Sequence, residues 1–217
     1  MKAIIAGATG LVGSHLLKQL AEDQDYDEIW VLTRRPLNSK QKKIKEVLAD
    51  FEDLESSLQH VKADHVFCCL GTTMKKAKSK EAFKKVDLEY PRELARIMLS
   101  RKAQKFLLVS ALGASTGSFI FYNRVKGEVE KEIRHLGYPG LVIFRPSLLL
   151  GDREEQRTGE DIAKKTYKYL DKLFIGPLKK YRGIHAATVA ACMIKMAKKS
   201  HIGTWILESD QIQECRG

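Results

Sequence analysis

The chain has 217 residues, of which 44% are apolar and 30% are charged, a composition typical of a soluble globular protein with one full core. No stretch stays apolar for the length of a membrane span, and a strand-like run begins at residue 2. We therefore expect no membrane anchor and no secretory or targeting segment. The four cysteines lack the spacing of a metal site. We expect no bound metal and four reduced thiols in a cytoplasmic protein.

The formal net charge is +11, and lysines cluster at residues 40–45, 75–85, 164–172 and 195–199. A solvated surface that also attracts an anionic cofactor accounts for this charge. A nucleic-acid partner is not expected, because the sequence has neither an RNP-like aromatic platform nor a recognisable helix-turn-helix. No pattern predicts an oligomeric state.

Strand-like runs alternate with helical patterns along the chain. The expected strands cover residues 2–6, 28–33, 45–49, 65–70, 106–110, 140–144 and 205–208. The expected helices follow the first glycine loop and cover residues 80–100, 122–136 and 186–199. This alternation predicts an α/β fold of Rossmann type, a doubly wound parallel sheet with helices on both faces, in one domain over residues 1–217. The polar, basic segment 151–182 is predicted to be a lid or substrate loop with some helix.

Three glycines follow the first strand at three-residue spacing. Gly7 permits a tight exit from the strand, Gly10 lets the backbone approach phosphate oxygens, and Gly13 lets the next helix pack against the sheet. The helix N-terminus adds N–H groups and a partial positive charge. This motif predicts a site for a dinucleotide pyrophosphate, lined also by Thr9, Leu11 and Val12.

The second strand ends in Thr33, Arg34 and Arg35. An NAD-specific site usually has an acidic residue here, whereas two guanidinium groups suit a 2′-phosphate. We therefore expect NADP(H) to be preferred over NAD(H).

Two further strand ends offer cofactor contacts. Asp50 and Phe51 follow the third strand and could hold the adenine, although an ordinary turn explains them as well. The fourth strand leaves through Leu70, Gly71 and Thr72, where a glycine lets the backbone approach a ribose. We include all five residues in the predicted cofactor site.

Tyr122 and Lys126 lie one helical turn apart and therefore share a helix face. A neighbouring ammonium stabilises a phenolate, so the phenol becomes a better acid at neutral pH. Ser110, at the end of the fifth strand, could hydrogen-bond the substrate oxygen. These three residues are the predicted catalytic site.

The chain resembles atypical members of the short-chain dehydrogenase/reductase family, among them the small NAD(P)-binding proteins related to the HIV Tat-interacting oxidoreductase. The similarity rests on residues 7–13, 70–73, 86–87, 110–114, 122–128 and 145–151. It implies NADP(H) binding and a Ser–Tyr–Lys site, in which Lys126 also holds the nicotinamide ribose. It further implies that Arg145, Pro146 and Ser147 lie near the nicotinamide carboxamide.

The sequence departs from that family pattern at two positions. Relatives often have two serines at the fifth strand end, where this chain has Ser110 and Ala111. If the second serine is the working one, Ser115 would have to replace it. Familiar short-chain reductases place an asparagine in the fourth helix, where this chain has Asp87. We expect Asp87 to be a solvated helix residue.

The sequence thus predicts an NADPH-dependent oxidoreductase acting on a small carbonyl or alcohol substrate. The alternative is an NADPH-binding regulator that binds a protein partner without turnover. Sugar-nucleotide epimerases share these motifs but carry a longer C-terminal region, and only about 70 residues follow Arg145.

Overall fold

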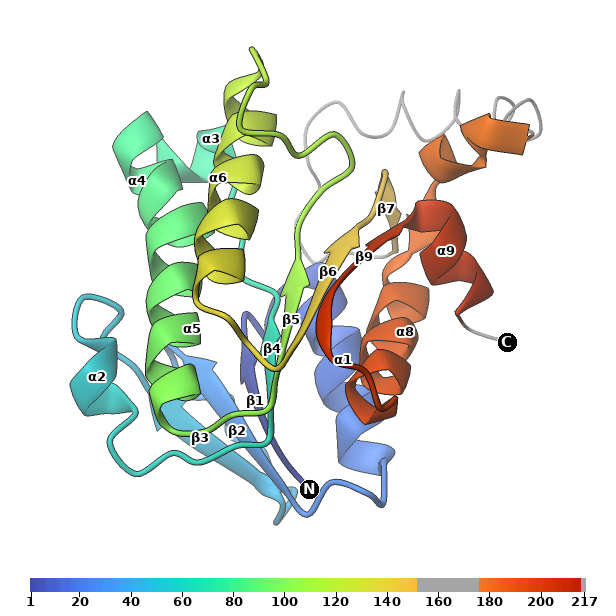
Figure 1. Cartoon of the computed structure of the whole chain (residues 1–217). Helices are drawn as coiled ribbons and strands as arrows, with labels where there is room; N and C mark the ends of the chain where they lie inside the picture. The colour runs from blue at the N-terminus through green and yellow to red at the C-terminus, as the bar shows by residue number, and fades with distance from the viewer. Residues whose placement is uncertain (152–175, 216–217) are drawn as a thin grey trace.

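Seven parallel strands form the central sheet in the computed structural model, which describes residues 1–151 and 176–215 (Figure 1). The strand order is β3-β2-β1-β4-β5-β6-β9, so the order reverses between β1 and β4. Ligands of open α/β sheets bind beyond the carboxyl ends of the strands at such a reversal. The strands are β1 (Lys2–Ala6), β2 (Glu28–Thr33), β3 (Ile44–Leu48), β4 (His65–Cys68), β5 (Lys105–Val109), β6 (Gly140–Arg145) and β9 (Gly203–Glu208).

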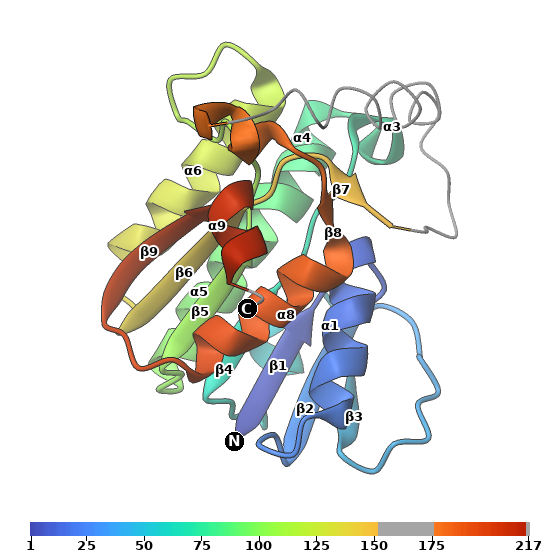
Figure 2. The same cartoon turned by 90° about the vertical axis from the view of Figure 1, so that its right-hand side faces the viewer.

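Helices cover both faces of this sheet, which confirms the predicted doubly wound fold. On one face, α1 (Leu11–Glu22) packs beside α8 (Ala186–Lys198), as Figure 2 shows. On the other face lie α5 (Tyr90–Ser100) and α6 (Phe121–His135) (Figure 1). The shorter helices are α2 (Leu54–Ser57), α3 (Met74–Ala77), α4 (Lys80–Lys84) and α9 (Ser209–Glu214).

The two layers have separate apolar cores on either side of the sheet. Ile5 is buried with Leu16 of α1, whereas its neighbour Ile4 is buried with Met98 of α5. Successive side chains of a strand point to opposite faces, so a strand covered on both sides is apolar at every position. This explains why the central strands are near-continuous apolar runs rather than alternating ones.

The predicted elements agree with the structure to within two residues at most ends. The predicted helix over residues 80–100 is instead α4, a π-helical turn at Lys85–Glu89 and then α5. A small second sheet of β7 (Leu149–Leu150) and β8 (Ile184–His185) was not predicted. The 3₁₀ helix Gly176–Tyr181 lies in the segment 151–182, where some helix was expected. Most of the predicted lid, residues 152–175, lies outside the described residues. In the described ranges, no helix combines the length and apolarity needed to cross a membrane.

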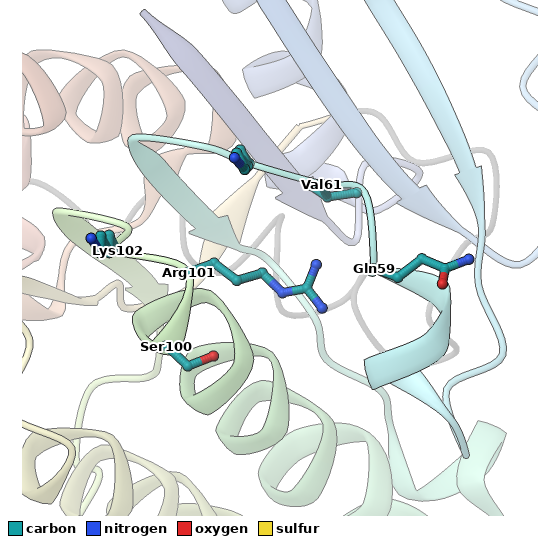
Figure 3. Close-up of a pocket in the computed structure, with 6 residues that line it drawn as sticks. Gln59, Val61, Ser100, Arg101 and Lys102 are labelled. Atoms are coloured by element: carbon teal, nitrogen blue, oxygen red, sulfur yellow. The ribbon is translucent and has the colours of Figure 1, made fainter.

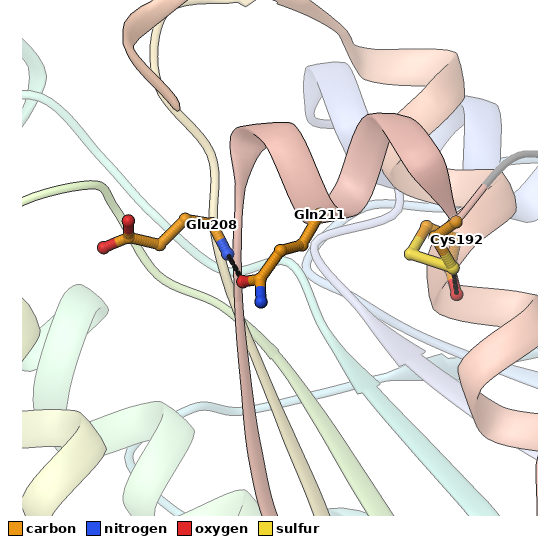
Figure 4. Close-up of a disulfide and its surroundings, with 4 residues drawn as sticks. Cys192, Glu208 and Gln211 are labelled. Atoms are coloured by element: carbon orange, nitrogen blue, oxygen red, sulfur yellow. Dashed lines mark hydrogen bonds between the residues drawn. A yellow bond between two sulfur atoms is a disulfide. The ribbon is translucent and has the colours of Figure 1, made fainter. Parts of the chain in front are cut away.

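A disulfide between Cys192 and Cys215 ties α8 to the residue that follows α9 (Figure 4). The expectation of four reduced thiols is therefore wrong for this pair, because the fold brings two cysteines 23 residues apart in sequence to a Cα–Cα distance of 5.5 Å. Cys68 and Cys69 remain free thiols. At its other end α9 is fixed by Gln211, whose side-chain oxygen accepts a hydrogen bond from the Glu208 N–H at 3.0 Å.

Candidate active site

The turn after β1 leaves no room for side chains at two of its three glycines. Gly7 has φ +86°, and a Cβ there would lie 2.5 Å from the carbonyl oxygen of Cys69, at the exit of β4. A Cβ on Gly13 would collide with the carbonyl oxygen of Gly7. The turn therefore needs glycine both for its backbone conformation and for its packing.

The same turn delivers the N-terminus of α1 to the point where the strand order reverses. Gly10 is the N-cap residue, and no side chain caps this end of the helix. The N–H of Gly10 donates to the Gly7 carbonyl at 3.0 Å, which closes the turn. The side chain of Val12 is buried in the core, Leu11 is half-buried and Thr9 is exposed. These residues can offer backbone N–H groups to a diphosphate, as the glycine motif requires.

At the end of β2, Thr33 is buried while Arg34 and Arg35 are exposed. The Thr33 hydroxyl donates to the Arg35 carbonyl at 2.8 Å and so shapes the turn that carries both guanidinium groups. Neither guanidinium has a salt-bridge partner among the residues that the structure describes. Both side chains are exposed, and an exposed guanidinium group can bind an anionic ligand.

Phe51 and Tyr90 form the neighbouring aromatic pair, with ring centroids 5.1 Å apart. The Tyr90 hydroxyl donates to Glu52 at 2.7 Å, and burial together with this bond raises the pKa of Tyr90 to about 12. The Asp50 carboxylate accepts the Glu52 N–H at 2.9 Å, which is the ordinary turn that the sequence left open. Tyr90 was not among the predicted site residues.

Asp87 is not solvated, contrary to expectation. Its side chain is 1% exposed, because the π-helical turn directs it under the exit of β4. Its Oδ2 accepts the N–H of Thr72 at 2.8 Å, and its Oδ1 lies 2.7 Å from Nζ of Lys126. A Cβ on Gly71 would lie 3.5 Å from Asp87 Oδ1 and 3.9 Å from Lys126 Nζ. The β4 exit, the π-helical turn and α6 thus meet at one carboxylate, while Leu70 packs its side chain against the core.

Tyr122 and Lys126 lie on one side of α6, as predicted. The Lys126 side chain is 5% exposed, whereas Tyr122 is 38% exposed and packs edge-on against Phe83. Burial alone would lower the pKa of Lys126, but the charge of Asp87 and the Tyr122 phenol together raise it above its ordinary value. The phenol therefore stands beside a buried ammonium that stays charged at neutral pH.

The Ser110 hydroxyl does not point to open solvent. Ser110 is 5% exposed, and its Oγ donates to Oε1 of Glu130 at 2.5 Å. Glu130 is 1% exposed and also accepts bonds from Arg145 at 2.9 and 2.5 Å. Glu130 was not among the predicted site residues, although its position one turn after Lys126 was a usable signal.

Ser115 lies in the loop before α6 and is exposed. Its N–H donates to the Asn123 carbonyl at 3.0 Å, and its Oγ accepts the Gly117 N–H at 3.3 Å. The loop touches α6 so closely that a Cβ on Gly127 would collide with the Ser115 backbone. The Ser115 hydroxyl proton is not used in these bonds, in contrast to that of Ser110.

Hydrogen bonds to three other elements fix the segment of Arg145, Pro146 and Ser147. Arg145 pairs with Glu130, and the Pro146 carbonyl accepts the Leu112 N–H at 3.0 Å. The N–H of Ser147 donates to Oγ of Ser209 in α9 at 2.7 Å. The turn is therefore fixed against α6, the β5 exit loop and α9.

Two shallow cavities lie away from these residues. One, of about 410 Å³, is lined by Gln59, Val61, Lys62, Ser100, Arg101 and Lys102 (Figure 3). There the Arg101 guanidinium donates to the Leu58 carbonyl. The other, of about 520 Å³, lies between α1 and α8. The described residues contain no cluster of three side chains that could hold a metal ion.

The chain is similar to a known protein family and to several individual proteins. The profile of the NAD dependent epimerase/dehydratase family matches residues 3–119. Protein HTATIP2 of Rattus norvegicus is 35% identical over 167 residues, which cover 75% of this chain and 69% of that protein. The mitochondrial protein FMP52 of Meyerozyma guilliermondii is 37% identical over 156 residues, covering 71% and 67%.

Among solved structures, ADP-L-glycero-D-manno-heptose-6-epimerase of Helicobacter pylori superposes with a TM-score of 0.72 at 16% identity. The superposition covers 99% of this chain and 79% of that one, and it supports the Rossmann-type fold. The expectation of a cytoplasmic protein is corrected by these comparisons, because several yeast relatives are named mitochondrial.

Proposed function

The chain belongs to the NAD dependent epimerase/dehydratase family, and from this premise we propose that it is an NADPH-dependent oxidoreductase of short-chain dehydrogenase/reductase type. The substrate class is a small carbonyl compound or the corresponding alcohol. The observation that carries the proposal is the Tyr122–Lys126 pair, whose ammonium is buried beside the β4 exit at the point where the strand order reverses.

The residues around the β1 turn fit a nicotinamide dinucleotide. The Gly7 turn admits no Cβ, and α1 begins with no side-chain cap, so the backbone at this end is accessible to a diphosphate. Arg34 and Arg35 would hold the 2′-phosphate of NADPH, and Phe51 with Tyr90 would line the adenine. Thr72 and Lys126 would contact the nicotinamide ribose.

In the proposed reduction, the phenol of Tyr122 donates its proton to the carbonyl oxygen. When bound, NADPH supplies the hydride that adds to the carbonyl carbon. The Lys126 ammonium stabilises the phenolate that remains, and water returns a proton to Tyr122 through its exposed side. The products are the alcohol and the oxidised nucleotide.

Ser110 enters this proposal as a positioning residue. Its hydroxyl already donates a hydrogen bond to Glu130, so Ser110 cannot donate to a substrate oxygen unless that bond breaks. Ser115 keeps its hydroxyl proton available in the loop beside α6. We propose that Tyr122 and Lys126 carry the chemistry and that Ser115, rather than Ser110, is the serine able to reach a substrate.

The test follows the near-ultraviolet absorbance of NADPH while a panel of aldehydes and ketones is supplied. General-acid assistance is worth about 10²–10⁴ in rate, so Tyr122→Phe should lose that factor in turnover with nearly unchanged NADPH affinity. Phe121→Leu, one residue earlier in α6, is the matched control and should retain turnover. Equal turnover of Tyr122→Phe and the unmodified protein would refute the assignment.

A second candidate is an NADPH-binding regulator without turnover, whose output is contact with a protein partner. It is favoured by one observation: the Ser110 hydroxyl and the Arg145 guanidinium are both bound to Glu130. Tight NADPH binding in calorimetry, with no consumption on any substrate of the panel, would select this candidate.

A further inference from the structure

Asp87 occupies a position that neither the glycine motif nor the Tyr–Lys pair assigns. It lies in the π-helical turn Lys85–Glu89, between α4 and α5. A π-helical turn adds one residue to a helix and often marks a functional site. Here the extra residue rotates the carboxylate inward, so that a charged side chain is almost wholly buried. Such burial requires a compensating partner.

The carboxylate has two partners on two different elements. Oδ2 accepts the Thr72 N–H at 2.8 Å, which fixes the β4 exit loop. Oδ1 forms a salt bridge with the Lys126 ammonium at 2.7 Å, and this oxygen has no hydrogen-bond partner in the described part of the chain. The Asp87 side chain therefore sets the spacing between the β4 exit loop and α6. In the proposed function, both elements contact the nicotinamide ribose.

Only a carboxylate satisfies this arrangement, because both partners are donors. An asparagine has one acceptor oxygen and presents an NH₂ group to the other partner. It would leave either the Thr72 N–H or the Lys126 ammonium without an acceptor. A buried ammonium without a partner loses its proton readily, because burial can lower the pKa of a lysine by up to about 3–5 units.

The remaining groups that face Lys126 do not supply the missing negative charge. Among residues 1–151 and 176–215, they are the Tyr122 phenol on α6 and the Cys68 thiol on β4. Burial raises the pKa of Cys68 to about 11, so this thiol is neutral in the physiological range. Asp87 is therefore the counter-ion that keeps Lys126 charged.

We propose that Asp87 is a positioning residue that holds the Lys126 ammonium charged and in register with Gly71 and Thr72, so that the site grips nucleotide over a wide pH range. This inference rests on the proposed function for the role of Lys126 toward nucleotide. The ion pair itself can be tested without any nucleotide.

The first experiment measures thermal unfolding of the nucleotide-free protein against pH. In Asp87→Asn, folded Lys126 binds fewer protons than unfolded Lys126, so the stability of this variant rises with pH relative to the unmodified protein. We expect its deficit in melting temperature to be largest near neutral pH and to shrink toward about pH 10. Asp87→Glu keeps the charge and should show no such trend.

The second experiment measures NADPH affinity by nicotinamide fluorescence between about pH 6 and pH 9. Asp87→Asn should lose about tenfold or more in affinity across this range relative to the unmodified protein, as Lys126 becomes neutral. In a Lys126→Met background, the same substitution should cause no pH-dependent loss. Glu128→Gln is the matched control. Glu128 lies on α6, as Lys126 does, and its partly exposed carboxylate pairs with Lys84 of α4, so this variant should behave as the unmodified protein does.

The outcomes separate the two proposals. A pH-independent stability deficit of Asp87→Asn, or a trend shared by Asp87→Glu, would overturn the role of Asp87 even if NADPH binds. Failure of every variant and of the unmodified protein to bind NADPH would overturn the proposed function, while the unfolding data would still decide whether Asp87 keeps Lys126 charged.

Discussion

The hydroxyl of Ser110 donates a hydrogen bond to the carboxylate of Glu130, 2.5 Å away, and both side chains are buried. The same carboxylate accepts two bonds from Arg145, so the ends of β5 and β6 are tied to α6 through one charge. The serine at the predicted catalytic position is thus part of the support of the site.

Ser110→Ala should reduce turnover by less than about tenfold. The change removes one hydrogen bond to a charged group, worth about 1.5–3 kcal/mol of stability, but leaves Arg145 on Glu130. Steady-state kinetics beside Ser115→Ala would separate the two serines. A loss as large as that of Tyr122→Phe would show that Ser110 binds substrate directly.

Glu130→Gln should destabilise the fold far more than it alters nucleotide affinity. Removing the buried carboxylate leaves the partly buried Arg145 without its salt-bridge partner, at a cost of up to about 3–5 kcal/mol. Denaturant unfolding measures this cost. Glu132→Gln is the control, because its ion pair with Arg92 is half-exposed at 4.0 Å and such pairs contribute little. Similar midpoints for the two variants would contradict the prediction.

The fold could be predicted from local patterns, and the glycine turn with it. The bounds of β2, Glu28–Thr33, could be predicted because a strand covered on both faces is a short apolar run with polar residues at its ends. The spacing of Gly7 and Gly13 also carries its own physical reason, since each position lacks room for a Cβ.

The details of the site depend on contacts that no local pattern contains. Asp87 is buried because α6 brings Lys126 to it, and the π-helical turn that aims it has no compositional signature. Cys192 and Cys215 meet only because α9 packs back on α8. Glu130 was overlooked because a helical glutamate is usually solvated, and only the approach of Arg145 makes its burial possible.

Gly7→Ala should prevent both stable folding of the β1 turn and NADPH binding. The added Cβ meets the Cys69 carbonyl oxygen at 2.5 Å, and the backbone has φ +86°. Gly137→Ala isolates the conformational part, because Gly137 has φ +73° with no atom within 4 Å of its Cβ position. The free energy of unfolding of this control should fall by only about 1–2 kcal/mol, the cost of placing an alanine in a left-handed backbone conformation. Comparable unfolding midpoints for the two variants would contradict the steric argument.

Acid should destabilise the protein partly through His65. Burial and the nearby Lys105 lower the pKa of His65 from 6.5 to about 4, while its ring bonds the Tyr26 hydroxyl at 2.7 Å. The folded state therefore binds fewer protons than the unfolded state between these values, and stability falls as pH falls through them.

His65→Gln lacks this pH-dependent contribution. The unmodified protein should therefore lose about 3 kcal/mol of unfolding free energy relative to His65→Gln between about pH 7 and pH 4. Denaturant titrations at several pH values measure it. His60→Gln, at an exposed position, provides the baseline. A difference that stays constant with pH would show that His65 titrates alike in both states.

Reduction of the Cys192–Cys215 disulfide should lower the stability of the fold by about 3 kcal/mol, the value expected for a closed loop of this length. Cys215→Ser should reproduce the effect without reductant, because Cys215 is only partly buried and the serine leaves α8 intact. The measurement is the melting temperature of both proteins with and without dithiothreitol. Reductant should lower the melting temperature of the unmodified protein and leave that of Cys215→Ser unchanged. If reductant lowers the melting temperature of both proteins equally, the Cys192–Cys215 disulfide is not the stabilising cross-link.

The Ser209 hydroxyl of α9 accepts a hydrogen bond from the Ser147 N–H, so α9 also supports the segment predicted to lie near the nicotinamide. The same samples should therefore show weaker NADPH binding once the disulfide is reduced.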